Sequence, residues 1–549
     1  MRILGCKVIC MANVQDFKPQ VKIQSDRAFQ LAIALISGIS MGLTPAPFNV
    51  WGLAWVAIAP LWILVVENST KSTDSSSFLI RPRFKVLLAI AWGLGYHGFG
   101  LAWIMGLHPL TWLGIPWLAS VTIVLIIWLF ITAWGAALVG VWAWIMRWIS
   151  RAGISSGLRV LVGTAVWCGL ESLWALGSLN WTSVSYTQSP HNLAILHLGQ
   201  ISGAMTVTAA IVSVNGLLAE AWIASRNQRE PRKSVYLVPV SLFLILHLIG
   251  FGLYSRPLIE APDAVLKVGI IQGNVPTRIK LFSDGLQRAI EGYSTGYRTL
   301  VDRGAEVVLT PEGALPFLWQ GLNRTQNPLY QAILEKGVPV WLGTFIPQGS
   351  QYTQSLLTIA PTGEAISRYN KVKLVPLGEY TPFQDLLGGL INRLSPIRAN
   401  MLPGSQDQQF DTPFGRAAVG ICYDSAFPDL FRAQVAKGAE FILTASNLDP
   451  YSTTLKTQHQ AHDLMRAIEH DRWSIRATNT GYSGIIDPHG RIQWRSQPDI
   501  YEIHVGTIYR RSTQTLYVRW GNWLTPGLIG LAEIGLLFRK KIPFLLSER

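Results

Sequence analysis

The chain has 549 residues, of which 49% are hydrophobic and 14% charged, and its 22 tryptophans exceed what an ordinary soluble protein carries, so membrane insertion is considered first. The formal net charge of +14 does not indicate a nucleic-acid binder, because the Lys and Arg residues form no continuous basic face and collect at the ends of apolar runs. The four cysteines are too scattered for a disulfide framework and have no zinc-site spacing.

Eight apolar stretches are predicted to cross a membrane, a task that takes about 20 residues of helix. They cover residues 28–43, 50–66, 84–106, 117–144, 158–176, 201–224, 235–254 and 523–538. The first has no small-x-small cleavage site and is interpreted as a retained anchor. The fourth is long enough for two crossings, but the placement of the flanking charges favours one.

The flanking charges predict the orientation of these spans. Lys and Arg gather before the first span and after the second, fourth and sixth, whereas the alternate loops carry none. The positive-inside rule therefore places both chain termini in the cytoplasm and the segment after the seventh span outside it. The predicted division is a cytoplasmic segment at 1–27, a seven-helix transmembrane domain at 28–256, an extracytoplasmic domain at 257–515, and a last span with a cytoplasmic tail at 516–549.

Three acidic residues fall within predicted spans, where ionisable groups are usually functional. Glu220 lies near a cytoplasmic end and is expected to snorkel, Glu171 is expected to pair with a neighbouring helix, and Glu533 stands alone. They form no proton relay, and no interrupted repeats are visible, so a transporter is a poor interpretation. The outer loop at 177–190, with Trp181 and Tyr186, fits either an interfacial aromatic belt or a lipid-binding surface.

Between residues 266 and 508 the pattern changes to short β-branched runs separated by helical stretches. This pattern predicts an α/β domain with layered αββα architecture, in which active groups collect at strand ends. Glu312 and Cys422 each follow a predicted core strand, and Lys371 lies where another strand ends. We therefore expect the three side chains to meet.

Covalent acyl chemistry needs these three residue types together. A thiol has an unperturbed pKa of about 8.5 and needs a base or a cation beside it to attack a carbonyl. Glu312 could take that proton and later return it to the leaving group, while Lys371 would stabilise the oxyanion. No metal or organic cofactor is indicated, since His459 and His462 on a predicted helix have no further ligands and are expected to be surface histidines.

The segments TPEGALPF, YNKVKLVPLGEYTPF and GICYDSAFPD, which contain Glu312, Lys371 and Cys422, resemble the Glu-Lys-Cys motifs of the nitrilase superfamily. With the flanking spans, nearly the whole chain resembles the apolipoprotein N-acyltransferase family of the bacterial inner membrane. The resemblance implies that Cys422 takes a fatty acyl chain from a membrane phospholipid as a thioester, and that the lysophospholipid leaves. The acyl chain would then pass to the α-amino group of the diacylglyceryl-cysteine of an apolipoprotein, the last step of lipoprotein maturation, with no cofactor and no stable protein partner.

The resemblance also implies supporting roles for Glu379, eight residues after Lys371, and for Tyr423, beside the nucleophile. Asp424 departs from the family pattern, which has glutamate there; a carboxylate is kept, with a reach one methylene shorter.

Three further residues are expected near the lipid entrance or pocket on the same resemblance. Phe282 is the aromatic nearest to the family's entrance tryptophan, Tyr451 in SNLDPYS stands where an aromatic is missing, and Asn479 lies in a matching Asn-Thr-Gly turn. Two alternatives remain: a membrane-anchored nitrilase-type amidase or hydrolase that gives its acyl group to water, and a lipid-binding scaffold with an inactive triad. Eight spans exceed what an anchor needs, which favours transfer.

Overall fold

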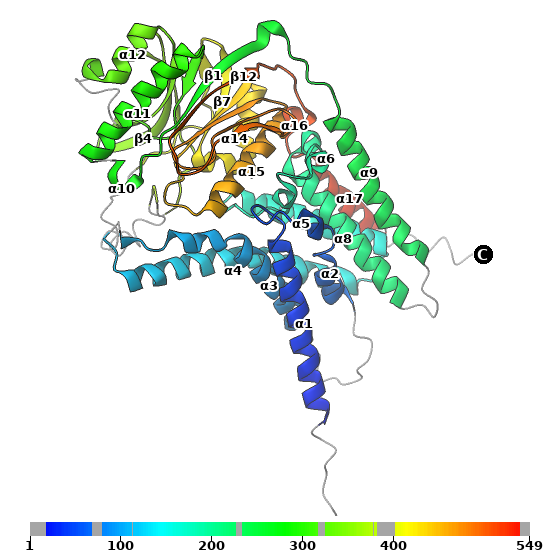
Figure 1. The fold of residues 1–549 in the computed structure, drawn as a ribbon. Helices are drawn as coiled ribbons and strands as arrows, with labels where there is room; N and C mark the ends of the chain where they lie inside the picture. The colour runs from blue at the N-terminus through cyan, green and yellow to red at the C-terminus, as the bar shows by residue number, and fades with distance from the viewer. Residues whose placement is uncertain are drawn as a thin grey trace, which may run out of the picture.

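The computed structural model describes residues 18–67, 80–111, 114–226, 233–280, 282–316, 324–376, 378–380 and 401–538. The predicted cytoplasmic tail after the last span lies outside the described residues, as does most of the predicted amino-terminal segment. Figure 1 shows two parts, a set of apolar helices and a two-sheet α/β part stacked on one side of them.

The apolar part consists of long helices joined by short 3-10 and helical turns. The main helices are α1 (Lys18–Gly42), α2 (Ala59–Val66), α3 (Ile80–Gly100), α4 (Trp117–Arg151), α5 (Ser156–Ala175), α8 (Ala204–Arg226), α9 (Leu237–Tyr254) and α17 (Leu524–Phe538). The turns are η1 (Trp51–Trp55), η3 (Ala102–Leu107), η5 (Val184–Gln188), α6 (Leu193–Leu196), α7 (Gly199–Ser202) and η6 (Lys233–Tyr236). The fourth predicted span is one continuous helix of 35 residues, α4, and is not a helical hairpin.

Four of the described helices are long and apolar enough to cross a membrane by length and composition, namely α4, α5, α8 and the segment Ser234–Tyr254 that includes α9. The other apolar helices in the described ranges are too short or not apolar enough, so the count of eight spans stays a prediction. The second predicted span is divided into η1 and α2, and Asn215 of α8 stabilises the break. Its Oδ1 accepts hydrogen bonds from the backbone N–H groups of Ile58 and Ala59, 2.9 Å each, where α2 begins.

Glu220 contradicts the prediction of a snorkelling side chain. Its carboxylate is buried and binds Arg159 through two hydrogen bonds of 2.6 and 2.7 Å, and Trp62 donates a third. The sequence could not show that Arg159 of α5 faces α8. Because Arg159 neutralises the buried carboxylate through two hydrogen bonds, the Glu220 side chain does not extend to the membrane surface. Glu533 is exposed on α17.

The α/β part contains two six-stranded sheets in the described residues, with orders β12-β1-β2-β3-β4-β5 and β11-β10-β9-β8-β7-β6. The first holds β1 (Val265–Gln272), β2 (Val307–Leu309), β3 (Val340–Gln348), β4 (Gln351–Ile359), β5 (Ala365–Asn370) and β12 (Glu502–Tyr509). The second holds β6 (Phe410–Thr412), β7 (Gly415–Ile421), β8 (Phe441–Ser446), β9 (Ser474–Thr478), β10 (Gly484–Ile486) and β11 (Ile492–Arg495). Strands β1, β2 and β3 run parallel in the first sheet, and β7, β8 and β9 run parallel in the second. Every other pair of neighbouring strands is antiparallel.

Side chains alternate between the two faces of the first sheet, as strand geometry requires. Val268 and Ile270 of β1 pack toward the second sheet, while Ile271 packs under helix α11 (Ser283–Asp302). Helix α12 (Pro328–Lys336) lies on the same face as α11, and helices α14 (Pro428–Ala436) and α15 (Thr453–His470) lie on the outer side of the second sheet (Figure 1). The predicted αββα sandwich beside an apolar helical part is confirmed.

Helix α15 joins the two parts of the molecule. Gln458 donates to the backbone oxygens of Ala46 and Gly100 in the helical part, at 3.0 and 3.1 Å. The prediction that His459 and His462 are surface histidines is wrong, because both are almost fully buried at this junction. The apolar helices cover the face of α15 that a soluble α/β domain would expose to water.

The loop at 177–190, predicted to lie outside, reaches the same junction, where Trp181 and residues 183–189 are buried. The His462 ring lies 3.9 Å from the Tyr186 ring and 4.6 Å from the Trp181 ring, measured between centroids. Glu171 binds a neighbouring helix, as expected, since Thr208 of α8 donates to its carboxylate at 3.3 Å. The same carboxylate also accepts hydrogen bonds from Ser183 and from the backbone N–H of Val184 in this loop. The loop therefore holds the α/β part against the helices and is not an exposed aromatic belt.

Candidate active site

The three residues predicted to carry the chemistry lie at strand ends that face one another. Glu312 follows β2, Lys371 follows β5 directly, and Cys422 follows β7 as the first residue of the 3-10 turn η9 (Cys422–Ala426). The backbone of Cys422 has φ of +50°, a left-handed conformation that costs a non-glycine residue energy and turns its side chain out of the strand. The two sheets thus contribute different members of one cluster.

An ammonium group held between two carboxylates forms the centre of this cluster. Lys371 Nζ lies 2.9 Å from Glu312 Oε1 and 2.5 Å from Glu379 Oε1, and Lys371 is fully buried. The second oxygen of each carboxylate is also fixed, since Glu312 Oε2 accepts from the backbone N–H of Asn447 and Glu379 Oε2 from that of Val375. The structure therefore brings together Glu312, Lys371 and Glu379.

Burial and charge set the protonation of these groups. Burial alone would lower the pKa of Lys371, but the carboxylates of Glu312 and Glu379 raise this pKa well above its usual value. Burial, together with the nearby charge of Glu312, raises the pKa of the Cys422 thiol, although Lys371 opposes the shift. The thiol is thus protonated at rest, and a base must remove its proton as the sulfur attacks. Burial also raises the pKa of Glu379.

Asp424 supports the turn that carries the nucleophile. Its Oδ1 accepts from the backbone N–H of Lys373 at 2.7 Å, and its Oδ2 accepts from the N–H of Ile421 at 3.0 Å and from Tyr369 Oη at 3.2 Å. Burial raises its pKa to about 6, against the effect of the backbone donors. Asp424 thus joins the strand before Cys422 to the segment after Lys371. Although aspartate is shorter than the glutamate of the family pattern, it still binds both segments.

Tyr423 connects the turn that carries Cys422 to the helical part of the molecule. Its hydroxyl donates to the backbone oxygen of Ser178 at 2.6 Å, and its ring stacks on Trp181 with centroids 6.2 Å apart. Tyr451 belongs to the same aromatic group, since its ring centroid lies 5.8 Å from that of Trp103, which in turn lies 5.7 Å from that of Trp181. Burial raises the pKa of Tyr451, and the charges of Cys422, Glu379 and Glu312 add to this shift, while Lys371 opposes it.

The two remaining predicted residues lie apart from each other. Asn479 is fully buried, and its amide binds both the N–H and the oxygen of Val275 and donates to Asn447 Oδ1 at 3.0 Å. It therefore helps to position the loop that binds Glu312, and its expected place near the lipid entrance or pocket stays a prediction. Phe282 is 68% exposed at the start of α11, where a large apolar side chain in water is uncommon. Its role at a lipid entrance stays a prediction.

Sequence reasoning missed two residues of this site. The backbone N–H of Asn447 binds Glu312, and Lys280, from the short helix α10 (Thr277–Lys280), donates to the backbone oxygen of Glu312 at 3.0 Å. A lysine in the segment QGNVPTRIKLF reads as a surface charge, and no periodicity marks it as buried. Only the fold shows that α10 turns this side chain inward.

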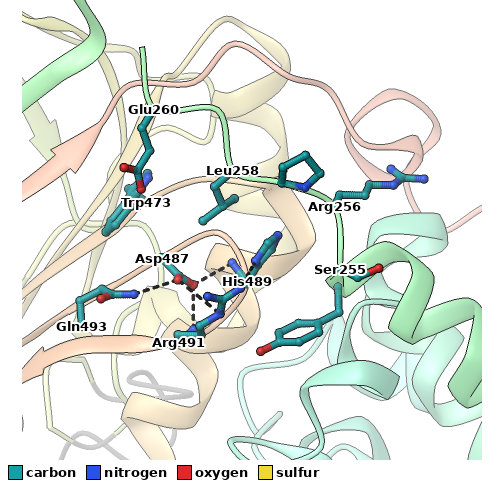
Figure 2. Close-up of a pocket in the computed structure, with 11 residues that line it drawn as sticks. Ser255, Arg256, Leu258, Glu260, Trp473, Asp487, His489, Arg491 and Gln493 are labelled. Carbon is teal, nitrogen blue, oxygen red and sulfur yellow. Dashed lines mark hydrogen bonds and ion pairs between the residues drawn. The ribbon is translucent and has the colours of Figure 1, made fainter. Parts of the chain in front are cut away.

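A separate cavity of about 320 Å³ lies where the end of α9 meets the turn between β10 and β11. Figure 2 shows Asp487 among the residues that line it, accepting hydrogen bonds from the backbone N–H groups of His489 and Arg491 and from Gln493. None of the predicted site residues lines it. The side-chain cluster around Cys422, and not this cavity, is therefore the candidate active site.

Two family models match the chain in the order that the fold shows. The apolipoprotein N-acyltransferase N-terminal domain matches residues 37–217, and carbon-nitrogen hydrolase matches residues 267–517. Among solved structures, an amidase from Nesterenkonia sp. matches 48% of this chain and 96% of its own, with a TM-score of 0.36 and 17% identity.

Curated relatives match over nearly their whole length. An apolipoprotein N-acyltransferase from a Nostoc species is 56% identical over 496 residues, which are 90% of this chain and 96% of that protein. One from a Synechocystis species is 47% identical over 525 residues, 93% of this chain and 100% of that protein. The chain belongs to the apolipoprotein N-acyltransferase family, in which a nitrilase-type domain is joined to apolar helices.

Proposed function

We propose that this protein transfers a fatty acyl chain from a membrane phospholipid, through a thioester on Cys422, to the α-amino group of the N-terminal diacylglyceryl-cysteine of apolipoproteins. Family membership supports the reaction class, and the cluster around Lys371 supports the catalytic roles. The observation that carries the proposal is the buried Glu312–Lys371–Glu379 arrangement beside a thiol at a strained strand end.

The first half-reaction forms the thioester. Glu312 takes the proton of the Cys422 thiol while the sulfur attacks the ester carbonyl of the phospholipid, which forms a C–S bond and an oxyanion. Lys371, held in place by two carboxylates, stabilises that oxyanion. Collapse of the intermediate breaks the ester C–O bond, and Glu312 gives its proton to the departing lysophospholipid oxygen.

The second half-reaction returns the enzyme to its starting state. The α-amino group of the apolipoprotein attacks the thioester carbonyl, and Glu312 accepts the proton that the nitrogen loses. The C–S bond then breaks, and the Cys422 sulfur leaves as thiolate and takes that proton back from Glu312. Lys371 again stabilises the oxyanion, so the same three groups serve both halves. Glu379 keeps the ammonium in position throughout.

We further propose that the protein is a multi-pass protein of the bacterial inner membrane with its α/β domain outside the cytoplasm. The domain leaves the helical part after α9 and returns at α17, where Leu524 donates its N–H to Ser202 Oγ at 2.9 Å and Asn522 donates to Ser172 Oγ at 3.0 Å. These contacts join the start of α17 and the residues before it to the end of α5 and to α7, which directly precedes α8. Both regions are predicted to lie outside. This agreement supports the orientation derived from charges.

The test uses the full-length protein in phospholipid vesicles with a synthetic diacylglyceryl-cysteine peptide as acceptor. The measured product is the N-acylated peptide, detected by mass spectrometry. Cys422→Ala is the test variant, and Cys168→Ala is its matched control, because Cys168 is the other buried cysteine of the described residues and lies in α5.

We expect N-acylated peptide from the wild type and from Cys168→Ala, and none from Cys422→Ala. Free fatty acid released at the same rate with and without the peptide would show a hydrolase instead. Undiminished product from Cys422→Ala would remove the thioester from the reaction.

A further inference from the structure

The geometry points to Lys280 as a positioning residue for the general base. Its ammonium group, bound to the backbone oxygen of Glu312, holds this segment so that the Glu312 carboxylate is oriented for proton removal from Cys422. This inference rests on the proposed function, because it assigns a role within the same reaction.

The Lys280 side chain is buried, which is energetically unfavourable for an ammonium group. Its side chain is 5% exposed, and its Nζ donates to the Glu312 backbone oxygen at 3.0 Å. In the part of the chain that the structure describes, no carboxylate forms an ion pair with it. A buried ammonium without an ion-pair partner is unfavourable unless neighbouring charge or function compensates for it.

The backbone around Glu312 is shaped to admit this ammonium. Gly313 has φ of +56°, and a Cβ at that position would lie 3.5 Å from Lys280 Nζ and 3.1 Å from the Phe345 ring. The helix α10 that carries Lys280 is fixed in turn, since the N–H of Thr277 donates to Asp449 Oδ2 at 2.7 Å. A larger residue than glycine would therefore press on the contact between Lys280 and Glu312.

The contact fixes the segment that carries the general base. The Glu312 carboxylate is held by the Lys371 ammonium and by the backbone N–H of Asn447. Lys280 holds the same residue through its backbone oxygen. Without Lys280 that buried oxygen would lose its donor, and the segment could turn the carboxylate away from Cys422.

The charged groups that act on Lys280 come from two loops. Burial lowers the pKa of Lys280 to about 8, while Glu312, after β2, and Asp449, after β8, oppose this shift. Lys280 therefore stays protonated at neutral pH and below.

The experiment measures the rate of Cys422 acylation against pH, between about pH 5 and 9, for the full-length protein in vesicles of a labelled phospholipid. Three variants separate the charge of Lys280 from its hydrogen bond. Lys280→Met removes both, Lys280→Gln keeps a donor without charge, and Lys280→Arg keeps both. Lys456→Met is the matched control, because Lys456 is equally buried in the same domain but pairs with Asp499 at 2.5 Å.

We expect Lys280→Met to slow acylation by roughly 10- to 100-fold at pH 7, as for a lost hydrogen bond to a charged group. Lys280→Arg should recover most of the lost rate, and Lys456→Met should keep the wild-type rate. The wild-type rate should also fall as the pH rises through about 8, where Lys280 loses its proton, and this fall should be absent in Lys280→Arg. The pH of this fall does not depend on how much protein folds. The same fall in the wild type and in Lys280→Arg, or a wild-type rate in Lys280→Met, would overturn the inference, while absence of acylation in the wild type would overturn the proposed function.

Discussion

Replacement of Lys371 by methionine tests the electrostatic core of the mechanism. Methionine is similar in length and fills the space, so the change removes the charge and its donors with little loss of volume. Two carboxylates, Glu312 and Glu379, would then face each other without the ammonium that now lies 2.9 and 2.5 Å from them. Loss of one oxyanion donor costs about 2.7–4 kcal/mol of transition-state stabilisation, which is a 10²- to 10³-fold slower reaction.

The same change has a separate effect on folding. Removal of one partner of a buried ion pair destabilises a protein by roughly 3–5 kcal/mol, because an uncompensated charge stays buried. Protonation of Glu379, whose pKa burial already raises, would relieve part of this cost. We therefore expect a folded but less stable variant, most stable at low pH.

The assay is the rate of label transfer from phospholipid to Cys422 in a single turnover, with the folded fraction measured on the same sample. The folded fraction follows from alkylation of Cys168, which is buried in the native protein and takes no part in the reaction. Acylation by folded Lys371→Met at the wild-type rate would refute the role of Lys371 as oxyanion donor.

Three further predictions concern the same cluster. Glu379→Gln should slow acylation roughly 10- to 100-fold, measured in the same assay, because the amide cannot accept from both the Lys371 ammonium and the Val375 N–H. Asp424→Asn should lower the free energy of unfolding by about 1–3 kcal/mol, measured by denaturant titration, since its amide group would meet a backbone N–H; unchanged stability would contradict the contacts described. Alkylation of Cys422 in the wild type should be slower at pH 7 than that of a free cysteine and still rise above pH 9, because the pKa of its thiol is raised. A plateau near neutral pH would indicate a preformed thiolate.

The sequence predicted the layered fold and the meeting of the triad because both depend on local patterns. Strands of β-branched residues that end on Glu312 and Cys422 place these side chains at the ends of parallel strands, whatever the details of the loops. Glu379 was found only through the family resemblance, since a glutamate eight residues after Lys371 has no periodic signal. In the structure, the segment after β5 folds back and brings it to the same ammonium.

Contacts between the two parts of the molecule were beyond sequence reasoning. The polar face of α15 has the pattern of a surface helix, yet His459 and His462 are covered by the loop at 177–190. Glu220 looked free to reach the membrane surface because its partner, Arg159, lies on another helix. In both cases the pairing depends on how distant elements pack, and hydropathy does not report that packing.

The central claim, an acyl thioester on Cys422, is tested most directly by the mass of the peptide that contains this residue. The protein is incubated with phospholipid alone, digested, and measured before and after treatment with hydroxylamine, which cleaves thioesters. The mechanism predicts a mass increase of one fatty acyl chain on Cys422 that hydroxylamine removes and that disappears when the diacylglyceryl peptide is added. An unmodified Cys422 in protein that N-acylates the peptide would contradict it.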